Sequence, residues 1–172
     1  PKVNAGYVMS KYWKLKIDKR RELKISFGLI EELSKFRQLN NKDNESGGTL
    51  IGSFLSNDNG FIIDKLTIPQ KKDKQTRHSF YRSEQHNEIV QKIWKETNGF
   101  STFLGLWHTH PEDIPKYSSI DKKDWLDSLV ESKYEKNCLF FFIVGLTHIR
   151  CWIGINGIFF NKIKLLGDYK YE

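Results

Sequence analysis

Hydrophobic and polar positions follow two periodicities along the first third of the chain. Alternation predicts a short strand over 13–17 and a second over 23–26. Apolar residues at helical spacing predict a helix over 27–36. A glycine pair then opens a strand over 47–56, and the turn 57–60 returns the chain into a strand over 60–68. These two strands should form a β-hairpin.

The rest of the chain predicts two more helices and four more strands. Residues 71–80 are charged and indicate a loop. Ser83 is a plausible N-cap for a helix that stops at Gly99, and Ser118 opens the other helix. We expect strands over 102–110, 139–144, 148–153 and 158–165. Hairpins outnumber βαβ units in this order, so the sequence predicts an α/β sandwich with a mixed, mostly antiparallel sheet and flanking helices.

Length and composition indicate one folded domain. The chain has 172 residues, of which 14% are aromatic, enough to build a core. The formal net charge is +7, with a dense basic run at Lys71, Lys72, Lys74 and Arg77. Because aromatic residues do not interleave with this run, a solvated or protein-facing loop is favoured over a nucleic-acid-binding stripe.

Short stretches of the sequence indicate where the protein is located and where its natural chain starts. The longest apolar run, 138–145, is too short to cross a bilayer, and no signal segment opens the chain, so we expect a cytoplasmic protein. Cys138 and Cys151 lie in apolar surroundings and should be reduced core thiols. Met9 is the only methionine and the expected natural start. Residues 1–8 then form an expression-tag remnant or fused peptide, and 9–172 a single domain.

The stretch HTHPEDIPKYSSID, residues 108–121, carries the candidate chemistry. Residues two apart on a strand point to the same side, so His108 and His110 should point together with Cβ atoms roughly 6.5 to 7 Å apart. Two imidazoles at this spacing can bind one zinc ion. The alternative is a pair of surface histidines at a strand end.

Asp121 and Glu45 are candidates to complete a site. Asp121 falls in the first turn of the helix opened by Ser118 and could face the histidines as a third ligand. Ser-x-x-Asp before an apolar helix is also close to a capping box, so both residues have a structural alternative. Glu45 precedes Gly47 and Gly48, which allow close backbone approach. Its carboxylate could reach a water at the site, or it could be an exposed loop residue.

Together these residues resemble the JAMM (JAB/MPN+) metalloprotease motif. That motif is a glutamate, then His-x-His-Pro, seven residues to a serine and two more to an aspartate. Here Glu45, His108, His110, Ser118 and Asp121 match without adjustment. The resemblance covers almost the whole chain and implies the MPN/JAB-like, cytidine-deaminase-like sandwich.

The resemblance also implies roles for these residues. His108, His110 and Asp121 would bind one catalytic Zn²⁺ ion. Glu45 would accept a proton from water and pass it to the leaving amine, and Ser118 would stabilise the oxyanion. The protein would then be a zinc-dependent isopeptidase that cleaves after the C-terminal glycine of a conjugated protein.

Residues outside this motif narrow the resemblance to small bacterial JAMM proteins of mobile elements and antiphage CBASS operons. Trp107, Pro115 and Trp125 fit this group, as does the stretch 76–82. The implied partner is the C-terminal tail of a conjugated cGAS-like nucleotidyltransferase. Arg77, Arg82 and His86 become candidate substrate contacts, with solvated arginines and a helix-edge histidine as the alternative.

Other functions stay open at this point. A JAMM protease could instead deconjugate a bacterial ubiquitin-like protein or process a sulfur-carrier protein, and the same catalytic residues would serve. A non-enzymatic alternative is a basic binding module or a scaffold. The first of these predicts salt-sensitive nucleic-acid binding, and the second predicts partner binding without bound metal.

Overall fold

The computed structural model describes residues 11–172, which form α-helices, β-strands and one short 3₁₀ helix. The helices are α1 (Phe27–Ser34), α2 (Gln85–Glu96) and α3 (Ser119–Glu131). The strands of the large sheet are β1 (Tyr12–Lys16), β2 (Glu22–Ser26), β3 (Gly47–Phe54), β4 (Gly60–Leu66), β7 (Thr102–Thr109), β8 (Cys138–Val144), β9 (His148–Asn156) and β10 (Asn161–Lys170). A separate hairpin consists of β5 (Lys74–Thr76) and β6 (Ser79–Tyr81).

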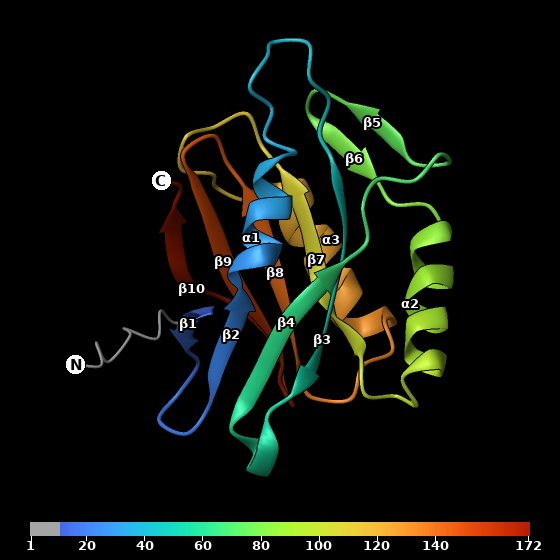
Figure 1. The fold of residues 1–172 in the computed structure, drawn as a ribbon, viewed down its shortest axis with the longest axis vertical. Helices are drawn as coiled ribbons and strands as arrows, with labels where there is room; N and C mark the ends of the chain where they lie inside the picture. Colours follow the sequence, from blue (N-terminus) through green and yellow to red (C-terminus); the bar gives the residue numbers. More distant parts are fainter. Residues whose placement is uncertain (1–10) are drawn as a thin grey trace, which may run out of the picture.

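The large sheet has the order β1-β2-β4-β3-β7-β8-β9-β10 (Figure 1). Only β2 with β4 and β7 with β8 pair in parallel, so the sheet is mixed and mostly antiparallel as predicted. The sheet curves until its first and last strands approach each other, and the rings of Trp13 and Tyr169 lie 5.5 Å apart. The strand order makes β3 and β7 the two central strands of the sheet.

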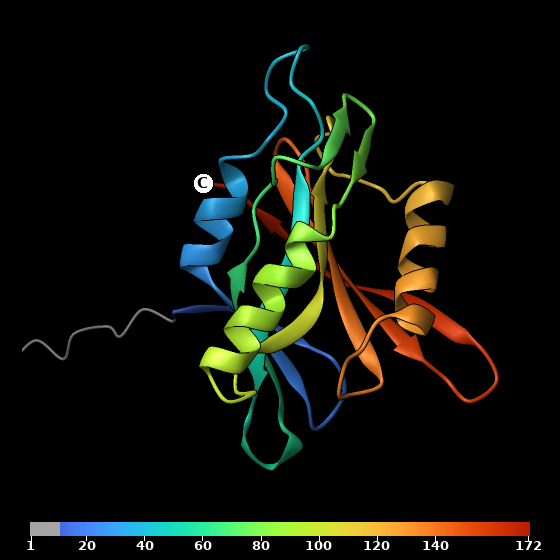
Figure 2. The ribbon, with the colours of Figure 1, turned by 90° about the vertical axis from the view of Figure 1, so that its right-hand side faces the viewer.

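Helices cover both faces of the sheet (Figure 2). α1 lies over β2 and β4, α3 lies on the opposite face against β8 and β9, and α2 packs against β3 and β7. Two apolar clusters result, one beneath α1 and one beneath α3. β8 contributes to both because every residue of CLFFFIV is buried, which is typical of a strand covered on both faces.

Three local predictions were wrong. Residues 71–80 are not only a loop, because they contain β5 and part of β6. The last strand begins at Asn161 instead of 158, since Ile158 and Phe159 are 96% and 93% exposed at the tip of the β9–β10 hairpin. Ser83 does not cap α2: Glu84 is the N-cap residue, and no side-chain hydrogen bond caps this helix.

The described residues test two predictions, one about membrane-spanning segments and one about the two cysteine thiols. Among residues 11–172, no helix is long and apolar enough to cross a membrane. Cys138 and Cys151 are free and buried, and burial raises the pKa of both thiols, to about 11 for Cys138. This confirms two core thiols and disfavours a catalytic one. The prediction for residues 1–8 lies outside the described residues.

Candidate metal centre

The end of β7 presents the two histidines to one point. His108 pairs with Gly47 of β3 on one side and Ile143 of β8 on the other, so its backbone is fixed in the sheet. His110 follows the last strand residue and donates its backbone N–H to Val144. Their Nε2 atoms lie 3.1 Å apart, which confirms that the His-x-His spacing aims both rings to the same side.

The capping box at α3 brings Asp121 to the same point. The Ser118 hydroxyl accepts from the backbone N–H of Asp121 at 3.1 Å, and the Ser118 backbone N–H donates to Asp121 Oδ2 at 2.8 Å. Helix capping and a ligand position beside the histidines are therefore compatible for Asp121. The cap fixes the carboxylate, and the same carboxylate lies 3.2 Å from His108 Nε2 and 3.1 Å from His110 Nε2.

These three side chains fit a zinc ion. Each offers one ligand atom, and the three atoms lie within 4.8 Å of one another. The 3.1 Å between the two Nε2 atoms and the 3.2 Å from His108 Nε2 to Asp121 Oδ1 are near the roughly 3.3 Å edge of a tetrahedron with metal–ligand bonds of about 2.0 to 2.1 Å. Two imidazoles and one carboxylate also form the donor set of catalytic zinc sites, which leaves a fourth position open.

Glu45 lies beside this triad instead of in an exposed loop. Its residue exposure is 5%, and Oε1 lies 3.5 Å from His110 Nε2. Burial is the main reason that the pKa of Glu45 is raised to about 7; the nearby His110 opposes the rise, and Asp121 adds to it. A carboxyl with a pKa near neutrality is suited to both accepting and releasing a proton.

The charges of the triad are coupled. Burial lowers the pKa of His108. Burial also acts to lower the pKa of His110, but Asp121 and Glu45 outweigh it and raise that pKa. For Asp121, burial acts to raise the pKa, but the hydrogen bonds from His108 and His110 hold it below its usual range. Asp121 therefore stays ionised and available as a ligand.

One functional candidate was missed by sequence reasoning. Glu112 Oε1 lies 2.9 Å from His110 Nδ1, on the ring nitrogen that faces away from the triad. A carboxylate at this nitrogen fixes the ring orientation and leaves Nε2 free for a metal. The signal in the sequence is an acid two residues after the second histidine.

The glycine pair has the expected role of close approach. A Cβ on Gly48 would lie 2.1 Å from the carbonyl oxygen of Thr67 and 2.8 Å from Trp107 Nε1. A Cβ on Gly47 would lie 2.5 Å from the ring of Phe80. Both glycines therefore let the β5–β6 hairpin and the segment after β4 pack against the start of β3, next to Glu45.

The three candidate substrate contacts have different surroundings in the structure. His86 is 1% exposed, with Nε2 2.8 Å from Asp73 Oδ2 and Nδ1 2.7 Å from the Thr67 hydroxyl. It was expected on the edge of a helix, and burial with both ring nitrogens occupied corrects the idea of direct substrate contact. Its role is to join α2 to the segment that leads into the hairpin.

The two arginines bind within the chain. Arg82 donates to both carboxylate oxygens of Asp124, at 3.2 and 2.9 Å, and so joins the hairpin stem to α3. Arg77 donates to the carbonyl of Asn40 at 3.0 Å in the loop before Glu45. Substrate contact by either guanidinium stays a prediction.

The comparisons with known proteins agree with this geometry. Residues 29–154 match the family model described as prokaryotic homologs of the JAB domain. The chain belongs to this JAB family. The match includes every residue of the triad, Glu45 and the strands that hold them.

Relatives of this JAB protein have been named in several bacteria. A protein of Escherichia coli named CD-NTase/cGAS isopeptidase is 35% identical over 127 residues, which is 73% of this chain and 76% of that protein. A protein of the same name from Pseudomonas aeruginosa is 33% identical over 129 residues, covering 74% of this chain and 80% of the relative.

A solved structure supports the fold of this JAB domain. A protein of Desulfitobacterium hafniense, determined in solution, superposes with a TM-score of 0.55 over 81% of this chain and 88% of that one. Its sequence identity is 16%, so the likeness concerns the fold alone. Together with the family match, it confirms the predicted MPN/JAB-like α/β architecture.

Proposed function

We propose that this JAB protein is a zinc-dependent isopeptidase that removes a cGAS-like nucleotidyltransferase from proteins to which its C-terminal glycine has been joined. The observation that carries the proposal is the gathering of His108, His110 and Asp121 with the buried Glu45 carboxylate 3.5 Å from one of them. The names of the relatives supply the substrate class, and the earlier resemblance supplies its setting in antiphage CBASS operons.

Each residue has a chemical task in this hydrolysis. His108, His110 and Asp121 would hold one Zn²⁺ ion, which when bound acts as a Lewis acid toward water and the scissile carbonyl. Glu45 accepts a proton from the attacking water and delivers it to the amine as the C–N bond breaks. The Ser118 hydroxyl accepts from Asp121 N, so its own hydrogen can be donated to the developing oxyanion.

We propose that the tail of the substrate binds over the β5–β6 hairpin. A hollow of about 490 Å³ is lined by residues of both strands, from Lys74 to Thr76 and from Ser79 to Tyr81. A two-stranded hairpin has unpaired backbone groups along its outer edges, and an extended peptide can bind such an edge.

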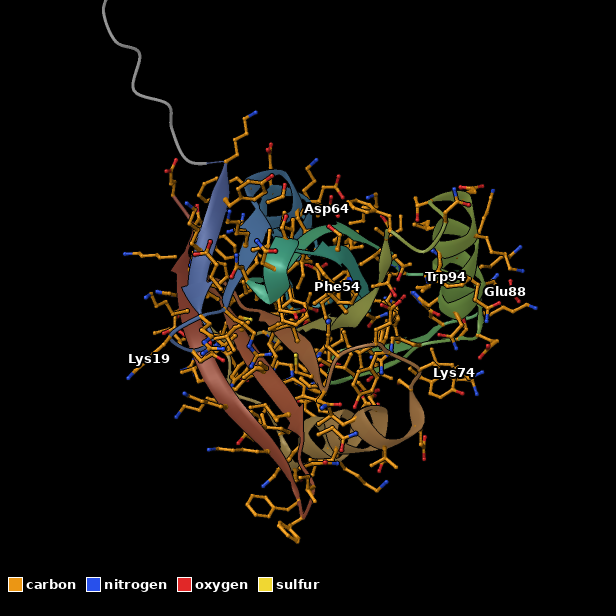
Figure 3. All side chains as sticks on the ribbon, turned by 90° about the horizontal axis from the view of Figure 1, so that it is seen from below. Lys19, Phe54, Asp64, Lys74, Glu88 and Trp94 are labelled. Atoms are coloured by element: carbon orange, nitrogen blue, oxygen red, sulfur yellow. The ribbon has the colours of Figure 1, made fainter. Side chains whose placement is uncertain are left out.

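The distribution of lysines agrees with a dispersed basic surface. Lys19, in the β1–β2 connection, and Lys74, on β5, lie on opposite sides of the molecule (Figure 3). A nucleic-acid-binding surface would gather such residues on one face. Basic residues therefore do not all lie on one face of the molecule.

The proposal is tested with a cGAS-like nucleotidyltransferase fused through its C-terminal glycine to a reporter protein. Wild type should release the reporter, and Glu45→Ala should reduce the rate by at least about a hundredfold, since general acid–base catalysis contributes roughly 10²–10⁴. A ubiquitin–reporter fusion is the control substrate, and Thr97→Val is a control variant remote from the triad.

The outcomes separate the proposed function from its alternatives. Cleavage of the nucleotidyltransferase fusion alone supports this substrate. Cleavage of the ubiquitin fusion alone would instead favour deconjugation of a ubiquitin-like protein. Equal activity of wild type and Glu45→Ala would contradict the role given to the glutamate.

A further inference from the structure

We propose that Gln38 is a positioning residue that fixes the proton acceptor relative to the metal ligands. This rests on the proposed function, because it gives a structural cause for the placement of Glu45. Gln38 follows α1 and is 2% exposed. Its side chain joins three parts of the chain that are distant in sequence: the histidine-bearing end of β7, the loop before Glu45, and the β5–β6 hairpin.

Both the oxygen and the nitrogen of the Gln38 amide group bind to these parts. Oε1 accepts from the Thr109 hydroxyl at 2.9 Å. Nε2 donates to the carbonyl of Asp43 at 3.2 Å and to the carbonyl of Arg77 at 2.9 Å. An amide offers one carbonyl oxygen and two N–H donors, so an acid or an apolar side chain of similar size could not make the same set of bonds.

Thr109 extends this connection to the residue beside Glu45. Thr109 stands between His108 and His110, and its side chain points to the opposite side from theirs. Its hydroxyl accepts from the Ser46 backbone N–H at 2.9 Å, and its backbone N–H donates to the Ser46 carbonyl at 2.9 Å. The residue after Glu45 is therefore bound to the residue between the two histidines.

The hairpin holds the Glu45 peptide from the other side. The Glu45 backbone N–H donates to the Thr76 carbonyl at 2.7 Å, and the Gln75 side chain donates to the Glu45 carbonyl at 2.8 Å. Arg77, at the hairpin turn, donates to the carbonyl of Asn40 in the same loop. Gln38 is the buried group that joins this arrangement to β7.

The side chain of Glu45 depends on this backbone support. Among residues 11–172, the polar partner of its carboxylate is His110 Nε2 at 3.5 Å, which is longer than a hydrogen bond. The position of the carboxylate is therefore set by its backbone. A displacement of about 1 Å in a reacting group can lower a rate by as much as about a hundredfold, so loss of the Gln38 connection should lower kcat.

A pair of substitutions at Thr109 isolates the connection. Thr109→Val keeps the shape and removes the hydroxyl, whereas Thr109→Ser keeps the hydroxyl. We expect Thr109→Val to lower kcat at least about tenfold, with KM within about twofold and zinc content per chain unchanged, and Thr109→Ser to restore kcat. A purely structural loss would reduce the folded fraction and leave the kcat of the folded, zinc-loaded protein unaltered.

Thr97→Val is the matched control. The Thr97 hydroxyl also donates and accepts, at the end of α2: it donates to the Ile93 carbonyl at 2.8 Å, with a longer contact of 3.4 Å to the Trp94 carbonyl, and accepts from the Ser101 N–H at 3.0 Å. It should lose a similar amount of stability with kcat unchanged. A kcat of Thr109→Val within about twofold of wild type, or a similar fall in Thr97→Val, would overturn the proposal.

A second measurement needs neither substrate nor cleavage. Hydrogen–deuterium exchange of peptides covering 39–47 should be faster in zinc-loaded Thr109→Val and in Gln38→Met than in wild type and Thr109→Ser. If wild type cleaves no fusion, the proposed function fails, and exchange still decides the positioning claim. Unchanged exchange over 39–47 in both variants would overturn it.

Discussion

At the residue scale, the Glu45 carboxyl is in surroundings that favour its neutral form. It is buried and lies near Asp121, and its pKa is raised from the ordinary 4.5 to about 7. The partly opposing effect of His110 is smaller than that of burial. Ionisation of a carboxyl in such surroundings lowers the stability of the folded protein, and a bound cation would reduce this loss.

This gives a pH-dependent prediction for Glu45→Gln in the metal-free protein. Below pH 4.5 the carboxyl is protonated in both the folded and unfolded states, so it adds no difference. As pH rises from 4.5 to about 7, the unfolded state loses its proton first, so wild type loses stability relative to Glu45→Gln. The variant should be more stable by on the order of 1–2 kcal/mol above pH 7, after discounting for partial solvation.

Urea unfolding of both proteins in chelator at pH 4 and pH 8 checks this. The quantity to compare is the difference between the two unfolding free energies at each pH, because titrating groups that do not interact with Glu45 cancel in it. A difference that is equal at both pH values would show that Glu45 has an ordinary pKa in the folded protein.

Gly48 gives a prediction about close packing. Gly48→Ala should lower the free energy of unfolding by about 3 kcal/mol or prevent folding, since its Cβ would lie 2.1 Å from the Thr67 carbonyl oxygen. Gly28→Ala in α1 is the control, because its nearest contact would be 3.4 Å and alanine favours a helix by roughly 0.5–1 kcal/mol. Thermal unfolding of the two variants distinguishes these cases. Equal melting temperatures would contradict the packing described here.

Sequence reasoning worked best where a residue's role follows from local spacing. The His108 and His110 pair follows from strand periodicity, and Ser118 with Asp121 follows from helix capping. Gln38 could not be found in this way, because its partner Thr109 lies 71 positions away and only the folded sheet brings them together. The burial of His86 was not predicted for the same reason, because its partners Thr67 and Asp73 lie in the segment between β4 and β5.

At the element scale, the β5–β6 hairpin was predicted as a loop. Its strands have three residues each, and only the middle residue of each is partly buried, so no alternating pattern is long enough to be detected. Its stability comes from its ends. Asp73 accepts from the backbone N–H groups of Gln70 and Ser83 and lies 2.8 Å from His86 Nε2.

Asp73→Ala should therefore loosen the hairpin. Three acceptor contacts disappear together, so local opening becomes more frequent. We expect trypsin to cleave after the basic residues of 71–77 severalfold faster than in wild type, measured by mass spectrometry at short digestion times. Cleavage after Lys19 and Arg20 in the β1–β2 turn is the internal control. An equal increase there would indicate general destabilisation in place of hairpin opening.

The longer helices and strands were predictable from the sequence because burial determines which of their residues are apolar. β8 is apolar throughout because it is covered on both faces, and α1 buries Leu29, Ile30 and Leu33 at helical spacing. The start of β10 was placed too early because Ile158, Phe159 and Phe160 continue the apolar pattern while lying exposed at a hairpin tip. Apolar character alone does not distinguish a buried strand from such a tip.

At the scale of the whole molecule, the curved sheet brings the site residues together from separate parts of the chain. The end of β7 supplies the histidines, the start of α3 supplies Asp121, and the loop before β3 supplies Glu45. Because β3 and β7 are adjacent antiparallel strands, the start of one meets the end of the other. The site therefore forms only when the centre of the sheet is folded.

Zinc should stabilise this assembly. The ligands belong to β7 and α3, so an ion that binds all three favours the folded state over the unfolded one. At zinc concentrations about a hundred times the dissociation constant, the gain is about 2.7 kcal/mol. Calorimetry with and without chelator should show a higher melting temperature with zinc in wild type. His108→Ala with Asp121→Ala should abolish that difference, and a persisting rise would indicate binding elsewhere.

The central claim is that one metal ion at His108, His110 and Asp121 is required for isopeptide hydrolysis. The most direct test is to strip the protein of metal and measure cleavage of the nucleotidyltransferase fusion while zinc is added back in fractions of an equivalent. Cleavage should be absent at the start, rise in proportion to zinc and stop rising at one equivalent per chain. Full cleavage by the metal-free protein, or recovery of cleavage by Asp121→Ala at one equivalent, would contradict the account.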